Sequence, residues 1–218
     1  MNTSPITPSE MDDILKSKRY SLITIRVFDT VASLGGIIIL SPLLLISGLA
    51  VKVSSKGPIL YSQERVGRYQ KPFRIHKFRT MVQNADKMGA FVTVSNDQRI
   101  TKVGRLLRKT KLDELPQLFN VLKGEMALVG PRPEVKEYVD YYNENELQLL
   151  RLRPGITGLA SIEYSQESEL LDAADDVEKI YITSIMPEKH ALNYACIRKL
   201  GFWNNIKILF LTLMKLLR

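Results

Sequence analysis

The sequence contains few residues of the types that build disulfides or histidine-rich metal sites. It has one cysteine, Cys196, and two histidines, His76 and His190. A single cysteine excludes both an intrachain disulfide and a cysteine-ligated zinc site, and it suits a reducing compartment. The sequence also lacks internal repeats and low-complexity tracts. One globular domain with some added element is therefore the expectation for 218 residues.

Acidic residues are outnumbered by basic ones. The chain has 23 Asp and Glu against 31 Lys and Arg, which gives a formal net charge of +8. Such a surplus indicates an anionic partner: nucleic acid, an anionic membrane surface or a phosphorylated substrate. A nucleic-acid binder would carry aromatic residues interleaved with basic ones, or a recognition helix. Neither pattern is evident, so we expect no nucleic-acid partner.

Charge is absent from one long segment, Thr30 to Val51. This length suffices to cross a bilayer, which takes roughly 20 apolar residues. The acidic Asp12, Asp13 and Asp29 precede the segment, and no small-residue cleavage site follows it closely. A secretory signal peptide is therefore excluded.

Ser41 and Pro42 interrupt this apolar segment near its middle. Proline removes a helical hydrogen bond and kinks the axis, and a neighbouring serine helps to satisfy the freed carbonyl. The basic flanks on both sides give no inside–outside asymmetry. We predict a re-entrant helix that enters and leaves on the same face; an ordinary kinked transmembrane helix is the alternative. The flanking cations are Lys16, Lys18, Arg19, Arg26, Lys52 and Lys56.

From Gly57-Pro58 onward the composition is that of a soluble domain. Two strands are predicted, at 59–63 and 72–80, with a turn around Gly67. In the second strand Lys77 and Arg79 share one parity, so they project together and either meet phosphate or form a solvated face. Further expected elements are a helix from about Ser9 with Ser9 as its cap, a helix at 84–88, a strand at 91–94, a basic helix at 97–109 and a helix at 134–152.

Two adjacent carboxylates, Asp113 and Glu114, begin a short segment that ends at Gly124. Pro116 is tolerated only in a first helical turn, so we expect a helix that begins near Asp113 and is capped by Gly124. The carboxylates would then lie at the positive end of the helix dipole, among N–H groups that bind anions. A simple capping box formed by Thr110 and Asp113 is the structural alternative.

Two proline-containing loops present arginines. Arg132 lies between Pro131 and Pro133, which fix its backbone and suit it to clamp phosphate; a rigid turn with an exposed arginine is the alternative. The loop 153–158 combines Arg153 with two glycines, Gly155 among them, and the hydroxyl of Thr157, without the spacing of a P-loop.

The last segment, 199–218, is too apolar for a surface helix in water and carries few charges. An interfacial membrane helix with Trp203 near the headgroups accounts for its composition. Burial in the soluble domain is the alternative.

Several of these pieces occur together in the order typical of one family. The chain resembles the bacterial monotopic phosphoglycosyl transferases, in the form that consists essentially of the catalytic core. The resemblance runs from about Arg26 to Gly158 and departs after Thr157-Gly158, and the stretch 165–195 follows no pattern of the family. The matching motifs are GP at 57–58, QERVG at 63–67, KFRTM at 77–81, RIT at 99–101, LRK at 107–109, LDELPQL at 112–118, GPRP at 130–133 and RPGITG at 153–158.

The resemblance implies a reaction. Family members move a sugar-1-phosphate from a UDP-sugar to undecaprenyl phosphate and release UMP. Asp113 would be the nucleophile that forms a phosphosugar-aspartate, and Glu114 the Mg²⁺ ligand. Arg108 and Arg132 would neutralise the transferred phosphoryl group, and the 153–158 loop would hold the nucleotide. The Ser41-Pro42 break matches the re-entrant helix of the family.

The expected fold is therefore α/β and helix-rich with a small hairpin, in a monotopic protein on the cytoplasmic face of the bacterial inner membrane, bound to phospholipid. We expect a polar segment at 1–20, the re-entrant helix at 21–53, the catalytic domain at 54–198 and an interfacial helix at 199–218. The sequence leaves a homodimer open, and it does not identify the sugar. A direct glycosyltransferase that releases UDP and a non-catalytic membrane-surface protein are the alternative functions.

Overall fold

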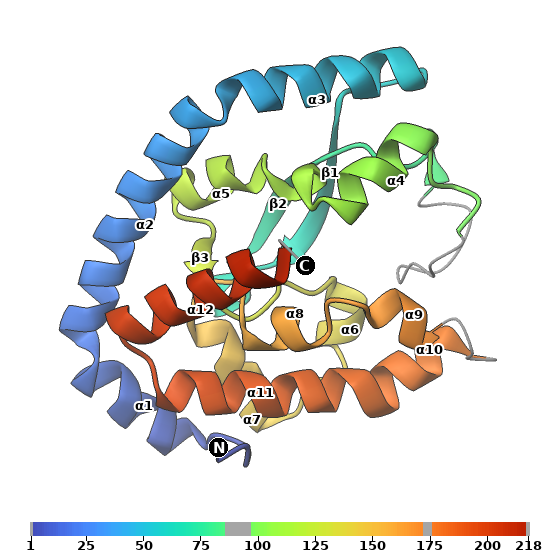
Figure 1. Ribbon diagram of the computed structural model, residues 1–218. Coiled ribbons are helices and arrows are strands. Elements are labelled where there is room, and N and C mark those ends of the chain that lie inside the picture. Colours follow the sequence, from blue (N-terminus) through green and yellow to red (C-terminus); the bar gives the residue numbers. More distant parts are fainter. Residues whose placement is uncertain (1, 86–96, 172–175, 217–218) are drawn as a thin grey trace.

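The computed structural model describes residues 2–85, 97–171 and 176–216. This part of the chain is helix-rich and contains two small sheets, which confirms the predicted class (Figure 1). One sheet is antiparallel and consists of β1 (Leu60–Val66) and β2 (Pro72–Phe78); the other is parallel and consists of β3 (Ala127–Val129) and β4 (Gly155–Thr157).

The chain begins with α1 (Pro8–Ser17), followed directly by α2 (Arg19–Ile39). Thr7 caps α1, because its hydroxyl oxygen accepts a hydrogen bond from the backbone N–H of Glu10 at 3.3 Å. The prediction of Ser9 as the cap was wrong: Pro8 needs no N–H partner and takes the first helical position, so the cap lies one residue before it.

The apolar segment breaks where its sequence predicted. Helix α2 ends at Ile39 and α3 (Ser41–Ser54) begins two residues later, so Pro42 lies in the first turn of α3. The Ser41 hydroxyl donates to the carbonyl of Ile38 at 2.7 Å and thereby satisfies one backbone group at the break. In Figure 1 α2 and α3 form one bent unit along the edge of the molecule. Among the described residues, α2 is the one helix long and apolar enough to cross a membrane.

Helices α2 and α3 each bury one face and expose the other. Helix α2 buries Ile25, Asp29 and Ser33 against the rest of the protein, and α3 packs Val51 against a cluster around Phe78. The opposite faces present large apolar side chains to solvent. Such contiguous exposed apolar surface marks an interaction site rather than an ordinary protein surface. The exposed residues are Tyr20, Ile23, Val27, Val31, Leu34, Ile38 and Ile39 on α2 and Leu45, Ile46, Leu49 and Val53 on α3.

The hairpin differs from the prediction at its ends. Strand β1 extends to Val66, three residues beyond the predicted end, because the 60–66 and 72–78 segments pair in full register across the turn. Strand β2 ends at Phe78, so Arg79 lies beyond the strand. Phe73 and Ile75 of β2 pack on the buried Val121.

The basic helix is shorter than predicted. Helix α4 (Lys102–Lys109) begins after Thr101, whose hydroxyl accepts from the N–H of Gly104 at 2.9 Å. The predicted start at Asp97 was wrong, because Ile100 forms an isolated bridge with Met81 instead. The predicted strand at 91–94 and most of the predicted helix at 84–88 lie outside the described residues.

The carboxylate segment also folds differently from the prediction. Leu112–Glu114 form a 3₁₀ turn, and helix α5 (Gln117–Lys123) begins after Pro116. Lys111 adopts a left-handed φ of 55° that separates this turn from α4, and Thr110 donates back to the carbonyl of Leu106 rather than forming a capping box. Both carboxylates therefore precede α5 instead of opening it. Gly124 caps α5 with a φ of 87°, as predicted.

The segment predicted as one helix at 134–152 is divided into short helical pieces, because Asn143 forms a capping box that starts a new helix within it. Three of these pieces, α6, α7 and η4, lie between β3 and β4. After β4 the chain forms further short helices and then two longer ones. The pieces are α6 (Lys136–Val139), α7 (Glu144–Leu147), η4 (Gln148–Arg151), α8 (Leu159–Glu163), α9 (Glu167–Leu171), α10 (Val177–Ile180), the π-helical turn η5 (Tyr181–Ile185), α11 (Met186–Arg198) and α12 (Phe202–Leu216).

Helix α12 is buried along one face and exposed along another, so burial in the soluble domain holds for part of the C-terminal segment and its membrane contact stays a prediction. Asn205 and Ile208 are buried against the body of the protein, and the ring of Phe202 meets Phe28 of α2 edge-on at 5.4 Å. Trp203 is 80% exposed and Phe210 is 59% exposed on the other side. One face thus packs on the protein, and the other adds to the exposed apolar surface of α2 and α3.

Candidate active site

Glu114 lies at the centre of the candidate site and is paired with two cations. Its Oε1 accepts from Lys77 Nζ and from an Arg132 terminal nitrogen, both at 2.8 Å. Burial opposes ionisation, but the charges of Arg132 and Lys77 overcome it and hold the pKa of Glu114 well below its usual value. Lys77 comes from β2 and Arg132 from the loop after β3. The tertiary fold therefore joins two of the predicted phosphate ligands to one predicted catalytic carboxylate.

Asp113 has a different environment, although it is adjacent in sequence. The residue is 7% exposed, and its Oδ1 is buried with no hydrogen-bond partner among the described residues. Burial and then the charge of Glu114 raise the pKa of Asp113, and the nearby cations Lys77, Arg108 and Lys111 offset this only partly. An anion that is desolvated and incompletely hydrogen-bonded is more reactive than a solvated one. The pair thus consists of one neutralised carboxylate and one poorly stabilised carboxylate.

The two remaining predicted phosphate ligands make contacts of their own. Arg108 donates from Nε to the hydroxyl of Thr80 at 2.8 Å, and its charge acts on Asp113. Arg79 donates to the carbonyl and the hydroxyl of Ser55, at 2.7 and 2.9 Å. The expectation that Lys77 and Arg79 project together was wrong, because β2 ends between them and the two cations bind different partners.

A cavity of about 260 Å³ opens beside Glu114. Its polar end contains Lys111, Glu114 and Arg132. Thr157 of the predicted substrate loop also lines it, and its hydroxyl is hydrogen-bonded to that of Thr212 on α12 at 2.8 Å. The remaining wall is mostly apolar, but it also contains Ser161, Ser165 and the cation Lys215 of α12; its apolar members are Leu115, Leu118, Leu128, Ile156, Ile162, Leu209 and Leu216. The cavity therefore combines cationic side chains with a mostly apolar wall.

The other members of the predicted substrate loop lie elsewhere. Arg153 donates from Nε to the carbonyl of Gly124 at 2.9 Å and lines a second cavity. Gly155 packs against Gly130 so closely that an added Cβ would lie 2.1 Å from the Gly130 nitrogen. Gly155 thus serves the pairing of β3 with β4, and Arg153 is directed away from Glu114.

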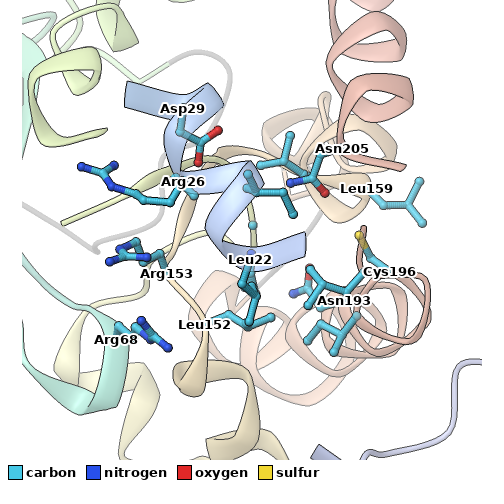
Figure 2. Close-up of a pocket in the computed structure, with 18 residues that line it drawn as sticks. Leu22, Arg26, Asp29, Arg68, Leu152, Arg153, Leu159, Asn193, Cys196 and Asn205 are labelled. Carbon is cyan, nitrogen blue, oxygen red and sulfur yellow. The ribbon is translucent and has the colours of Figure 1, made fainter. Parts of the chain in front are cut away.

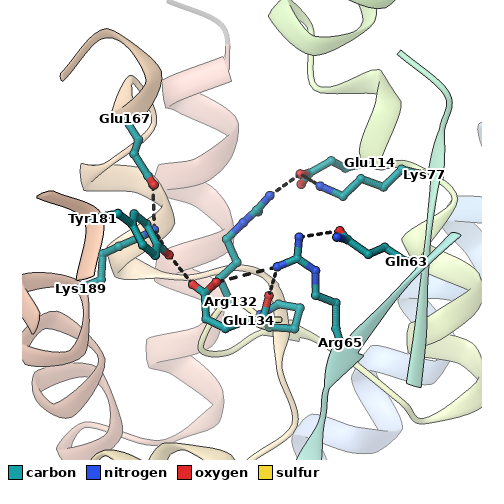
Figure 3. Close-up of polar contacts among 10 residues, drawn as sticks. Gln63, Arg65, Lys77, Glu114, Arg132, Glu134, Glu167, Tyr181 and Lys189 are labelled. Atoms are coloured by element: carbon teal, nitrogen blue, oxygen red, sulfur yellow. Dashed lines mark hydrogen bonds and ion pairs between the residues drawn. The ribbon is translucent and has the colours of Figure 1, made fainter. Parts of the chain in front are cut away.

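A buried polar network supports the Arg132 loop from behind (Figure 3). Glu134 Oε1 accepts from the Tyr181 hydroxyl at 2.6 Å, and that hydroxyl accepts from Lys189 Nζ at 3.2 Å. Lys189 also pairs with Glu167 at 2.7 Å. On the other side Arg65 donates to the carbonyl of Pro133 at 3.3 Å. Sequence reasoning gave none of these residues a role; the available signals were Arg65 within the QERVG motif and Glu134 directly after the GPRP motif.

The profile of the family described as Bacterial sugar transferase matches residues 20–218. The chain belongs to this family. It is 36% identical over 212 residues to a UDP-N-acetylgalactosamine-undecaprenyl-phosphate N-acetylgalactosaminephosphotransferase of Aeromonas hydrophila, an alignment that covers 96% of this chain and 47% of that protein.

Two further relatives of this chain differ in length. A UDP-glucose:undecaprenyl-phosphate glucose-1-phosphate transferase of Klebsiella pneumoniae is 39% identical over 195 residues, which cover 87% of this chain and 39% of that protein. A putative undecaprenyl-phosphate N-acetylgalactosaminyl 1-phosphate transferase of Bacillus subtilis is 39% identical over 154 residues, which cover 71% of this chain and 84% of that protein. The chain spans less than half the length of the Aeromonas and Klebsiella relatives.

The two carboxylates of the candidate site can be compared with the ligands that Mg²⁺ requires. Among the described residues, no group of three or more His, Cys, Asp or Glu side chains converges. Mg²⁺ nevertheless needs only one or two protein carboxylates when a diphosphate supplies other oxygens. Glu114, whose carboxylate Lys77 and Arg132 hold ionised, fits such a sparse ligand set.

His190 has a structural environment. It is buried, its Nδ1 lies 3.1 Å from Glu146 Oε1, and its ring meets that of Tyr142 edge-on. These contacts account for the residue within the packing of α7 and α11 and connect it to none of the groups at Asp113.

Proposed function

We propose that this member of the bacterial sugar transferase family transfers a sugar-1-phosphate from a UDP-sugar to undecaprenyl phosphate and so initiates the assembly of a glycan. The observation that carries the proposal is the division between Asp113 and Glu114: one carboxylate is buried with an unpartnered oxygen, and its neighbour is neutralised by Lys77 and Arg132. The names of the relatives give the substrate class.

In the first step Asp113 attacks the β-phosphorus of the UDP-sugar. A bond forms between a carboxylate oxygen and phosphorus, the bond from that phosphorus to the bridging oxygen breaks, and UMP leaves. Lys77, Arg108 and Arg132 supply positive charge close to this carboxylate pair, where it stabilises the charge that develops on the phosphoryl oxygens.

In the second step an oxygen of undecaprenyl phosphate attacks the same phosphorus. The bond to Asp113 breaks, the carboxylate is regenerated, and a polyprenyl-diphosphate sugar is released. The cavity beside Glu114 suits an amphiphilic acceptor, since its cationic end would hold the phosphate and its apolar wall the first part of the chain.

Glu114 is the residue that would hold Mg²⁺, together with oxygens of the diphosphate. When bound, the ion would neutralise the diphosphate and favour departure of UMP. Lys77 and Arg132 keep Glu114 ionised and oriented for this role.

The exposed apolar faces of α2, α3 and α12 support binding to a phospholipid membrane. Nucleotide sugars are cytoplasmic, so we place the site on the cytoplasmic face of the bacterial inner membrane, with the bent α2–α3 unit entering and leaving on that face. The acceptor would then reach the cavity beside Glu114 from the bilayer.

The test is the identity of the released nucleotide. Purified protein in lipid nanodiscs is incubated with undecaprenyl phosphate, Mg²⁺ and, separately, UDP-glucose, UDP-galactose and UDP-N-acetylgalactosamine. Acceptor-dependent release of UMP with at least one sugar is the expected result, and Asp113→Asn should release none. Release of UDP instead would identify a direct glycosyltransferase, and no release with any of the three donors would count against the proposal.

A further inference from the structure

A second cavity lies on the other face of the β3–β4 sheet. Ala127 and Val129 of β3 line it, whereas Leu128 lines the cavity beside Glu114, because successive residues of a strand point to opposite faces. Its volume is about 80 Å³, enough for one small group. Neither Asp113 nor Glu114 belongs to its wall, so the proposed transfer reaction leaves it unexplained.

Three arginines, Arg26, Arg68 and Arg153, line one end of this cavity (Figure 2). They come from α2, from the turn after β1 and from the loop before β4. Asp29 is the one carboxylate in the wall, which leaves an excess of two positive charges. We call these three residues the arginine cluster.

Structural roles account for only part of the cluster. Arg26 donates to the carbonyls of Val121 and Leu122 at the end of α5, at 2.7 and 3.1 Å. Arg153 uses only its Nε, and among residues 2–85, 97–171 and 176–216 neither of its terminal nitrogens has a hydrogen-bond partner. Arg68 donates hydrogen bonds from two of its nitrogens: from Nε to the carbonyl of Arg151 and from one terminal nitrogen to the hydroxyl of Tyr69.

The cluster is also costly to assemble. Burial and then the charges of Arg68 and Arg26 lower the pKa of Arg153, so the three cations repel one another. The turn that presents Arg68 holds two non-glycine residues in the left-handed region, Tyr69 at φ 57° and Gln70 at φ 60°. Strain and like-charge repulsion of this kind persist where a function compensates for them.

We propose that the arginine cluster binds a phosphoryl group at a site separate from the Asp113–Glu114 centre. Guanidinium groups with free terminal nitrogens form paired, charge-assisted hydrogen bonds to phosphate oxygens. Two sources have this chemistry: the headgroup of a membrane phospholipid and free inorganic phosphate. The cavity also has apolar lining residues, Leu22 and Leu200 among them, and the exposed Tyr20 and Trp203 lie two residues before Leu22 and three after Leu200 in sequence; aromatic residues of this kind suit a lipid at the membrane surface.

Cys196 provides a native reporter, because the only cysteine of the chain lines this cavity. The experiment measures how fast methyl methanethiosulfonate, a small uncharged reagent, modifies Cys196 in the full protein held in dodecyl maltoside micelles, which contain no phosphoryl group. Inorganic phosphate is titrated against potassium chloride at equal ionic strength. The readout is independent of sugar transfer, so it can fail or succeed whatever the outcome for the proposed function.

Phosphate should slow the modification of the wild type, by about tenfold at ten times its dissociation constant. Arg68→Gln and Arg153→Gln should each raise the phosphate concentration that gives half-protection by about tenfold or more. Arg74→Gln is the matched control, because Arg74 is exposed on β2 and lies outside the cavity wall. Its protection should equal that of the wild type.

The lipid arm adds phosphatidylglycerol to the micelles and omits free phosphate. Protection that appears with phosphatidylglycerol and disappears in Arg68→Gln would identify the headgroup as the source, whereas protection by inorganic phosphate alone would identify the free ion. Arg153→Gln also removes the hydrogen bond to the carbonyl of Gly124 at the end of α5, so this variant could unfold. Arg68 makes no such contact with α5, and Arg68→Gln therefore tests the proposal if Arg153→Gln does not fold. Equal modification rates in every arm would overturn the proposal.

Discussion

Asp113 and Glu114 are chemically alike and adjacent, yet the fold gives them opposite properties. Successive residues of a 3₁₀ turn point about 120° apart, so one side chain reaches Lys77 and Arg132 while the other enters a buried space without a partner for Oδ1. Environments that move two neighbouring pKa values in opposite directions are typical of catalytic pairs. The predictions at the scale of single residues follow from this division.

Replacing Asp113 with Asn should abolish turnover and stabilise the fold. The pKa of Asp113 is raised, so its proton binds more tightly in the folded state, and the free energy of unfolding falls as pH rises from 3.8 through the folded value. The amide does not titrate and escapes this loss, so we expect the free energy of unfolding at pH 7 to be higher for Asp113→Asn than for the wild type. Denaturant unfolding of both proteins at pH 7 measures it. A destabilised variant would contradict the assigned environment.

The same shift predicts the acid limb of the pH profile. Nucleophilic attack requires the carboxylate, so kcat/KM should fall as pH decreases through the raised pKa of Asp113, at a pH above the ordinary value of 3.8. Glu114 should not contribute to this limb, since its pKa is held below its usual value. Initial rates at low donor concentration between pH 4 and 8 provide the measurement. A value of kcat/KM that shows no decline down to pH 4 would refute the assignment.

Glu114→Gln should reduce kcat by about 10²-fold or more and raise the Mg²⁺ concentration needed for half-maximal rate. The amide keeps the shape but loses the charge that Lys77 and Arg132 neutralise. Glu125→Gln is a control carboxylate outside the Lys77–Arg132 pair, although it accepts from Asn120. Undiminished turnover of the wild type in excess chelator would exclude a metal requirement.

At the scale of elements, the π-helical turn η5 connects the C-terminal part of the chain to Arg132. Tyr181 lies at its first position and joins Glu134 to Lys189. The turn widens the helix locally, a feature frequent at functional sites. The stretch 165–195, which fitted no family pattern in the sequence analysis, lies within the residues that the family profile matches. Its residues Glu167, Tyr181 and Lys189 support the Arg132 loop from behind.

Tyr181→Phe should therefore affect both stability and rate. It removes hydrogen bonds to two charged groups, for a loss of about 1.5–3 kcal/mol in the free energy of unfolding. We expect kcat to fall several-fold with little change in KM for the donor, because a shifted Arg132 acts on the transition state. Tyr141→Phe, at an exposed tyrosine, is the control. If kcat and stability of the two variants are equal, the network does not position Arg132.

Elements defined by local chemistry were predictable from the sequence. The break at Ser41-Pro42 and the cap at Gly124 depend on residues whose backbone preferences are strong. The start of α5 was not predictable, because the left-handed conformation of Lys111 is imposed by the packing of α4 and the 3₁₀ turn. Lys77, Arg108 and Arg132 were recognised by charge and motif. Arg65, Tyr181 and Lys189 were not, since only tertiary pairing brings them to Glu134.

At the scale of the whole molecule, the exposed apolar faces of α2, α3 and α12 predict how the protein lies in the membrane. If α2 crossed the bilayer, Lys16 and Lys18 would lie outside the cell, against the positive-inside bias. A turn back at the break keeps both basic flanks in the cytoplasm and leaves the broken backbone at shallow depth, where Ser41 satisfies one carbonyl.

Single cysteines at Ser4 and Lys56, in a Cys196→Ser background, test this topology. Both positions are exposed, and Lys56 is preferable to Ser55 because Arg79 binds the Ser55 hydroxyl. Neither cysteine should react with a membrane-impermeant maleimide in intact cells, and both should react after permeabilisation. Labelling at position 4 from outside would demonstrate a transmembrane helix.

The central claim is that Asp113 carries the phosphosugar between the two substrates. Intact-mass analysis after incubation with the preferred UDP-sugar and Mg²⁺, without acceptor, measures this directly. We predict a mass gain equal to one sugar phosphate, localised by peptide mapping to Asp113, lost on addition of undecaprenyl phosphate and absent from Asp113→Asn. An active enzyme that shows no adduct under these conditions, or an adduct that persists in Asp113→Asn, would contradict the account.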